Sequence, residues 1–330
     1  MTRLERREHA LRRLIHINKT GYDTETIGHK KRKVIQLSPK KAESVKSLPT
    51  IPFTLSEALP YTPPEYHHHI SPSRNFPVHI HTFLNSTRVD DPAVTVCLSN
   101  YTDQMNSLTH CEKNFHSKLH DHLLGRMLHP TWSADPNEYS VEEHGKICIV
   151  NNRLYRHKVM RINYTTYDVR LGQDAINPRN HADIMSLSRH DDEHPFEYCR
   201  VIGIFHVDVI HNVEGATQHP VSKEVLWVRR FRHDKSYRAG FKQKRLHRLE
   251  FLPSTDDSAF GFLDPDEVIR AAHLIPAFHH GPTEKFLSGE SFGRAPGELD
   301  DYRYFYINMH SISFLSDFKL LNFWKQICRS

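Results

Sequence analysis

Residues 222–248 constrain the fold more than any other stretch, because they combine high charge with the side chains of a buried strand. The stretch contains ten Lys or Arg residues and two acids. Its apolar residues are spaced between the cations: Val225, Leu226, Trp227, Val228, Phe231, Tyr237 and Phe241. A solvated face would not need so many aromatic and β-branched residues, and a fully buried strand would not carry so much charge. We therefore expect a strand at the rim of a core, presenting a cationic and partly aromatic surface to an anionic partner.

A hydrophobic period of two begins near residue 144 and predicts a β-rich region. The predicted strands cover 146–150, 154–167, 200–210, 224–232 and 245–252. Asn151 and Asn152 would join the first two strands as a β-hairpin, since Asn accepts positive φ. The strand over 200–210 is expected to have one continuous apolar face, formed by Val201, Gly203, Phe205, Val207 and Val209.

Two helices are expected beside these strands. The first covers 112–128, where apolar residues recur at four-residue intervals as Phe115, Leu119, Leu123 and Met127. The second begins at Asp264 as N-cap, with Pro265 at the first helical position and Glu267 two residues later. Its expected buried stripe is Val268, Ile269 and Ala272, and Pro276 would end it. The predicted fold class is therefore α+β, with a small, partly open β-barrel domain preceded by a helix and by a long, irregular, basic N-terminal tail.

The composition divides the 330 residues into four expected parts. These are a basic, largely disordered tail over 1–75, a helical linker region over 76–143, the β-barrel-like domain over 144–280, and a loop with a poorly determined C-terminal tail over 281–330. Residues 1–47 contain thirteen Lys or Arg and five Asp or Glu. A basic arm of this kind is typical of contact with nucleic acid or of nuclear import.

One run of cations indicates a nuclear location, and two further features concern the compartment and the membrane. Lys30, Lys31, Arg32 and Lys33 have the composition of a nuclear import signal. The five cysteines are scattered and never form a C-x-x-C pair, which favours a reducing compartment. The sequence has no apolar run near ~20 residues, so we expect no membrane span, and the N-terminus lacks the apolar core of a signal peptide.

The motifs of common enzymes are missing from the sequence. There is no G-x-S-x-G, no Walker loop, no G-x-G-x-x-G after a strand and no H-E-x-x-H. Acids occur in runs, and we expect these to be solvated loop residues rather than a two-metal centre, because adjacent acids on a strand point to opposite sides. The runs are Asp90-Asp91, Asp191-Asp192-Glu193, Asp256-Asp257 and Asp300-Asp301. The sequence therefore predicts neither an enzyme nor a small-molecule substrate.

The 27 histidines raise the question of a metal site. Cys97, Cys111, His116 and His120 form a C-x13-C-x4-H-x3-H pattern, which lacks the close cysteine pair of structural zinc sites. The triplet over 67–69 has no second set of ligands beside it. From spacing alone we expect neither a metal nor a cofactor.

The basic strand region is the candidate site for nucleic acid. Its cations would neutralise phosphates, and two aromatic residues would stack on bases. The predicted contacts are Arg229, Arg230, Arg232, Lys242, Lys244, Arg245, Arg248, Tyr237 and Phe241. Trp227 would instead belong to the core. Two alternatives are a merely solvated face and a strand edge that docks a protein partner.

Several long segments of the sequence resemble one protein family. Four segments resemble uncharacterised proteins of mushroom-forming basidiomycete fungi that are associated with Kyakuja-Dileera-Zisupton (KDZ) transposable elements. The segments are HKVMRINYTTYDVRLGQDAINPRNHADIMSLS, RVIGIFHVDVIH, VSKEVLWVRRFRHDKSYRAGFKQKRLHRLEF and DHLLGRMLHPTW. The chain also resembles the small β domain at the C-terminal end of plant transposon-associated proteins. The resemblance covers residues 55–92 and 118–306. It implies a non-catalytic accessory module of a mobile element, with a transposase as a protein partner.

Two segments depart from this family. Residues 94–115 and 310–330 do not resemble the family's sequence at these positions. In both places the dissimilar sequence begins abruptly beside a segment that resembles the family closely. Our hypothesis is that both segments are translated intron and that the chain is a truncated fragment, which could lack function. A spliced transcript that retains these codons would contradict this hypothesis.

Overall fold

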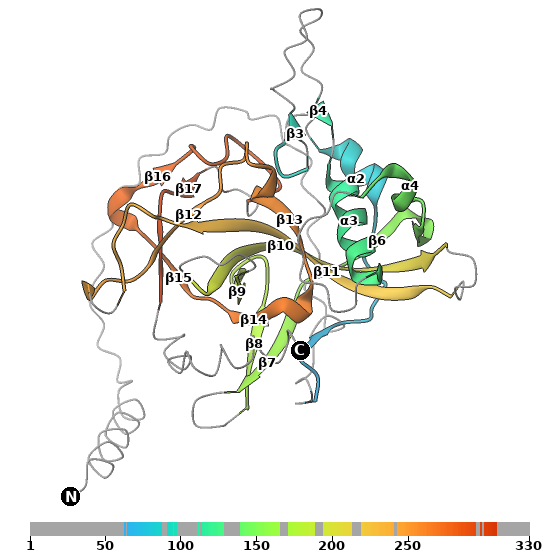
Figure 1. Cartoon of the computed structure of the whole chain (residues 1–330), viewed down its shortest axis with the longest axis horizontal. Helices are drawn as coiled ribbons and strands as arrows, with labels where there is room; N and C mark the ends of the chain where they lie inside the picture. Colours follow the sequence, from blue (N-terminus) through green and yellow to red (C-terminus); the bar gives the residue numbers. More distant parts are fainter. Residues whose placement is uncertain are drawn as a thin grey trace, which may run out of the picture. The chain divides into compact units, whose positions relative to one another are not determined.

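Figure 1 shows the computed structural model of the chain. It describes residues 63, 65–87, 91–94, 96–97, 111–112, 114–128, 139–165, 171–188, 194–212, 219–240, 243–294, 298 and 300–308. All of these belong to one of the chain's two compact units, residues 44–330. Several predictions concern residues outside those described: the Lys30–Lys33 run, Phe241, Lys242, Asp191-Asp192-Glu193, most of 94–115 and all of 310–330.

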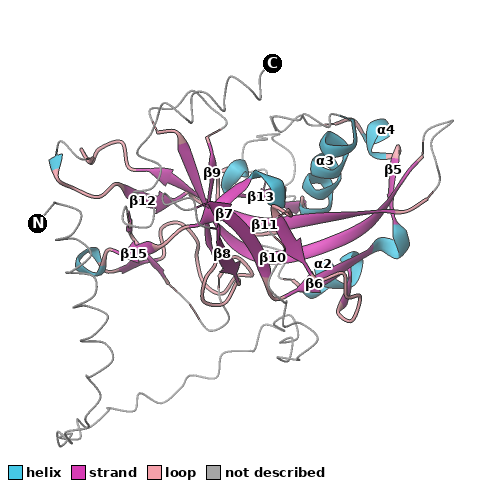
Figure 2. Ribbon diagram, turned by 90° about the horizontal axis from the view of Figure 1, so that it is seen from below, coloured by secondary structure: helices cyan, strands magenta, loops and turns pink. Residues whose placement is uncertain are grey.

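Two long antiparallel strands, β10 (Phe196–His211) and β11 (Val221–His233), run through the middle of the largest sheet (Figures 1 and 2). Both contain runs of β-branched and aromatic residues that suit a pleated, buried surface. The strands predicted over 200–210 and 224–232 are therefore confirmed, and both extend further than their apolar cores.

The largest sheet has eleven strands in the order β14-β9-β10-β11-β12-β18-β15, with β13 also paired to β11, β5 and β6 to β10, and β2 to β6. Its other strands are β2 (Pro77–His79), β5 (Ile147–Ile149), β6 (Arg153–His157), β9 (Asp183–Leu187), β12 (Arg248–Phe251), β13 (Phe260–Leu263), β14 (Val268–Ala271), β15 (Leu274–Pro276) and β18 (Phe305–Ile307). Three smaller sheets pair β1 (His68–Ile70) and β8 (Leu171–Ile176) with β7 (Met160–Thr165), β3 (Val96–Cys97) with β4 (Cys111–Glu112), and β16 (Pro282–Thr283) with β17 (Asp301–Tyr302).

A β-bulge in β10 decides which residues face each side of this sheet. The register against β11 shifts between Val201 and Gly203. A Cβ atom on Gly203 would lie 2.5 Å from the ring of Phe205, so this position excludes larger residues. The bulge places Val201 in a different hydrophobic cluster from Phe205, Val207 and Val209. The predicted single apolar face is therefore wrong at Val201, because the extra residue reverses the alternation.

Two helices, α2 (Ile80–Ser86) and α3 (Phe115–Leu128), share a hydrophobic cluster with residues of the paired strands β10 and β11. The short helix α4 (Val141–His144) contacts α3. The helix predicted over 112–128 is confirmed as α3, with Phe115, Leu119 and Leu123 buried in the same cluster as Trp227. Trp227 is 2% exposed, and its ring centre lies 5.2 Å from that of Phe115. Trp227 therefore belongs to the core, as the sequence predicted.

The predicted hairpin over 146–167 does not form. Asn151 and Asn152 do have positive φ angles of 53° and 51°. However, β5 and β6 on either side of them both pair with β10 instead of with each other. The two asparagines kink the chain while it continues along β10, because the long strand offers both segments a hydrogen-bonding edge.

The helix predicted after Asp264 is also absent. Asp264 does accept a hydrogen bond from the backbone N–H of Asp266, but the result is a single 3₁₀ turn, Pro265–Glu267. The chain then continues as β14, in which Val268 is buried and pairs with Ser186 of β9. The local capping signal was correct, and pairing with β9 overrode the helical continuation.

The chain is β-rich, as expected, but the sheets do not close into a barrel. Among the described strands, β14 and β15 end the sheet and do not pair with each other. The sheet also extends beyond the expected 144–280 domain, since β2 pairs with β6 and β18 pairs with β12. No helix in the described part of the chain is long and apolar enough to cross a membrane.

Candidate functional site

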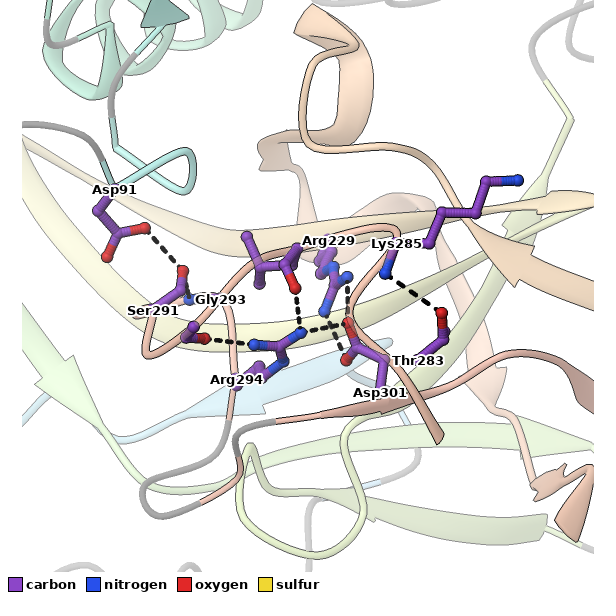
Figure 3. Close-up of polar contacts among 10 residues, drawn as sticks. Asp91, Arg229, Thr283, Lys285, Ser291, Gly293, Arg294 and Asp301 are labelled. Atoms are coloured by element: carbon purple, nitrogen blue, oxygen red, sulfur yellow. Dashed lines mark hydrogen bonds and ion pairs between the residues drawn. The ribbon is translucent and has the colours of Figure 1, made fainter. Parts of the chain in front are cut away.

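Arg229, a predicted phosphate contact, lies inside the protein and is 1% exposed. Its guanidinium donates two hydrogen bonds to the carboxylate of Asp301, at 2.9 and 2.8 Å. Arg294 donates to the same carboxylate at 3.0 Å, and Figure 3 shows both cations meeting Asp301. Burial opposes the charge of Asp301, but the hydrogen bonds and charges of the two arginines outweigh it and hold its pKa below the usual value. Arg229 is therefore a structural ion-pair residue and has no exposed surface to offer a phosphate.

Two of the acids expected to be solvated are buried. Asp301 belongs to the network just described and is 6% exposed. Asp91 is 3% exposed and accepts hydrogen bonds from the hydroxyl of Ser291 (2.6 Å) and the backbone N–H of Phe292 (3.0 Å). Figure 3 shows its contact with Ser291. The prediction of solvated loop acids is therefore wrong for Asp91 and Asp301, because each is buried and accepts hydrogen bonds from a residue far away in the sequence.

Two of the remaining predicted cations on the strands are paired with carboxylates, and the third donates to a backbone carbonyl. Arg232 pairs with Glu250 at 2.6 Å, and Arg248 pairs with Asp234 at 2.6 Å. Arg230 donates to the carbonyl oxygen of Ser258 at 3.1 Å. A strand alternates its side chains, so Arg230 and Arg232 lie on the opposite face from Arg229. The strands thus do not carry one converging row of available cations.

Exposed cations gather instead in the loop between β11 and β12, residues 234–247, which we call the basic loop. Lys235, Arg238, Lys244 and Arg245 are exposed there. Within the described residues, no carboxylate lies within ion-pair distance of any of the four. The neighbouring predicted contacts Phe241 and Lys242 lie outside the described part. Of these four exposed cations, Lys244 and Arg245 were predicted contacts, while Lys235 and Arg238 were not singled out from the sequence.

The backbone of the basic loop is held by local contacts. The N–H of Gly240 donates to the carbonyl oxygen of Arg245 at 2.9 Å. Gly240 has a φ of 105° and Lys244 a φ of 53°, so both positions use the left-handed region. The Asp234–Arg248 pair closes the base of the loop from the two flanking strand ends. The described residues on either side of residues 241 and 242 are therefore tied to each other by hydrogen bonds.

A tyrosine-lined face adjoins the basic loop. The guanidinium carbon of Arg248 lies 4.1 Å from the ring centres of both Tyr237 and Tyr304. Tyr306 is the cross-strand partner of Arg248 and lies 6.3 Å from Tyr237 between ring centres. All three tyrosines are half-buried. Tyr304 and Tyr306 were missed in the sequence because only the pairing of β12 with β18 brings them beside Tyr237.

Two groups of side chains offer metal-ligand atoms within 4.8 Å of one another. One is His194, His233 and His247, all half-buried. The other is His67, His68 and Asp266. The first group was not identified from the sequence, which drew attention to Cys97, Cys111, His116 and His120. Of these, His116 and His120 are neighbours on α3 with ring centres 4.3 Å apart. The triplet over 67–69 was considered, and the expectation that no further ligand lies beside it is wrong, because Asp266 joins His67 and His68.

The second group is an ion cluster rather than a metal centre. His68 donates to Glu224 at 2.6 Å and contacts Asp266 at 3.0 Å. Burial disfavours its charged form, but the hydrogen bonds and charges of the two carboxylates outweigh burial and raise the pKa of His68 to about 9. A histidine that holds its proton so firmly is a poor metal ligand.

The raised pKa of His68 predicts a pH-dependent stability. Because this pKa lies above the unfolded value of 6.5, the stabilisation is complete below pH 6.5 and is lost as the pH rises through about 9. We expect the free energy of unfolding to fall by about 3 kcal/mol more in the wild type than in a His68→Gln variant over this range. Urea denaturation at a series of pH values measures the difference, and parallel curves for the two proteins would contradict the prediction.

Comparisons of the chain with models of protein families, with curated proteins and with solved structures found no match in any of the three. Functional inference therefore depends on the arrangement of this chain's own residues.

Proposed function

We propose that this protein is a non-catalytic, nuclear accessory module of a transposable element, and that it binds nucleic acid through the basic loop. The observation that supports the proposal is the group of four exposed cations there that have no carboxylate partner within the described residues. A polyanion with closely spaced phosphates complements such a group. The KDZ resemblance and the Lys30–Lys33 run support the mobile-element and nuclear parts of the proposal.

The chemistry of the surface favours single-stranded nucleic acid. Cations of the basic loop would neutralise phosphates and release their counterions. Arg248 covers one face of Tyr304, so the half-buried ring of Tyr306 is the better surface on which an unpaired base can stack. The bases of a duplex already stack on one another. Binding of this kind tolerates many sequences, since every base has a face that can stack.

Docking of a transposase along a strand edge is the competing function, and the two ends of the main strand order offer it little support. The end strands β14 and β15 have four and three residues, and β15 ends at Pro276. Short edges with proline leave few backbone groups to pair with another chain. A protein partner would therefore need a surface other than these two edges.

The salt dependence of binding tests the proposal. Four phosphate contacts predict a slope of about −2.8 for log K against log salt, which is about a 50-fold loss of affinity for a single strand between 50 and 200 mM salt. The double variant Lys235→Gln/Lys244→Gln should reduce the slope by about 1.4, so that the loss falls to about 7-fold. Fluorescence anisotropy of a labelled oligonucleotide measures both values.

A matched control removes the same charge elsewhere. Lys146 and Lys223 lie at the opposite end of the β10–β11 ribbon, where β5 pairs with the last residues of β10. The Lys146→Gln/Lys223→Gln variant should keep the wild-type slope. Equal slopes for all three proteins, or affinity for the oligonucleotide that does not respond to salt, would refute binding through the basic loop.

A further inference from the structure

We propose that His194, His233 and His247 form a binding site for a divalent transition-metal ion of the zinc class, with a water as fourth ligand. The three residues come from separate segments: the turn before β10, the last position of β11 and the residue before β12. Their ligand atoms lie within 4.8 Å of one another. In a tetrahedral zinc site with Zn–N bonds of about 2.0–2.1 Å, the nitrogens lie about 3.3 Å apart, so the rings need to close by at most about 1.5 Å.

One backbone carbonyl orients two of the three rings. The oxygen of Phe196 lies 3.2 Å from Nδ1 of His194 and 3.4 Å from Nε2 of His233. Nδ1 of His194 could instead accept from the N–H of Phe196 at 3.3 Å. Donation of the two ring protons to this carbonyl would fix the orientation of both rings. Metal-binding histidines commonly donate their second nitrogen to a carbonyl in this manner.

The three rings lie close to one another. The ring centres of His233 and His247 lie 4.0 and 4.8 Å from that of His194. Tyr198 contacts the rings of His194 and His233, and its buried hydroxyl has no hydrogen-bond partner among the described residues. A metal-bound water would add a polar group to this enclosed site.

The site lies at the base of the basic loop, because His233 precedes its first residue and His247 is its last. A bound ion would therefore connect both ends of the loop to the start of β10 and stiffen the base of the β11–β12 connection. The site requires no nucleic acid. Metal binding and nucleic-acid binding can each fail without affecting the other, and the experiments that test them are separate.

Titration of the full chain with Co²⁺, followed by its visible absorption and by displacement with Zn²⁺, tests the site. One equivalent should produce the absorption of a four-coordinate ion. Loss of an outer hydrogen-bond partner typically weakens metal binding 10–100-fold, so loss of a ligand should cost on the order of 100-fold or more. We expect this from each of His194→Gln, His233→Gln and His247→Gln. The control His219→Gln, at an exposed histidine before β11, should bind as the wild type does.

X-ray absorption of the Zn²⁺-loaded wild type gives a second measurement that does not depend on how the variants fold. Three imidazole ligands at about 2.0 Å would support the site. Fewer than three imidazoles, the absence of a Co²⁺ absorption band, or wild-type affinity in a folded His247→Gln variant would overturn it.

Discussion

Replacement of Asp301 by Asn lowers the free energy of unfolding by about 3–5 kcal/mol, because it leaves two buried guanidinium groups without their counter-charge. The side chains of Arg229 and Arg294 are each 1% exposed, and both donate to this one carboxylate. Water cannot replace the lost charge at such depth, and Arg229 also lies 3.7 Å from the ring centre of Phe251. An amide of the same shape keeps the volume but not the charge. Urea denaturation followed by circular dichroism measures the change.

The exposed pair of Arg232 and Glu250 supplies the control. The Arg232 side chain is 44% exposed, so solvent already screens the interaction. The Glu250→Gln variant should lose about 1 kcal/mol or less. If Asp301→Asn destabilises the protein no more than Glu250→Gln does, the buried network does not stabilise the fold in the manner described.

The second large effect is expected at Trp227. Substitution by Ala should cost about 3–5 kcal/mol, because it opens a cavity where β11 meets α2 and α3. The ring packs edge-on against Phe115 and Phe83, with centres 5.2 and 6.0 Å away. Aromatic pairs of this geometry contribute beyond the area that they bury. Urea denaturation of the variant measures the loss.

An exposed aromatic residue tests whether the effect depends on burial. Phe278 is 67% exposed and lies in a 3₁₀ turn, Phe278–His280. The Phe278→Ala variant should change the free energy of unfolding by no more than about 0.5 kcal/mol. A comparable loss in both variants would show that the cluster around Trp227 does not dominate the stability of this region.

The charge-rich stretch shows how far sequence reasoning extends. Alternation of apolar residues predicted β11 and the burial of Trp227. Alternation also implies that Arg229 and Arg230 face opposite sides, but it does not say which side is buried. Asp301, which neutralises Arg229, lies 72 residues later. No local pattern links the two, so Arg229 was assigned to a surface that it does not reach.

Local signals were reliable about the backbone at their own positions and unreliable about the neighbouring segments. Asn151 and Asn152 do adopt positive φ, and Asp264 does cap a turn. The predicted hairpin and helix failed because β10 and β9 provided hydrogen-bonding edges for the segments beside those signals. A turn residue determines its own conformation, whereas the partner of the next segment depends on which strand lies nearby.

By itself, the sequence determined the β-rich character of the chain, the helix over 115–128, and which apolar side chains are buried in the core. Periodicity carries this information, because hydrophobic burial acts on each segment separately. The tertiary structure alone decided which cations stay available, where Tyr237, Tyr304 and Tyr306 meet, and that three distant histidines converge. Pairing of charges and of ligands depends on distance in space, and only the packed sheet sets that distance.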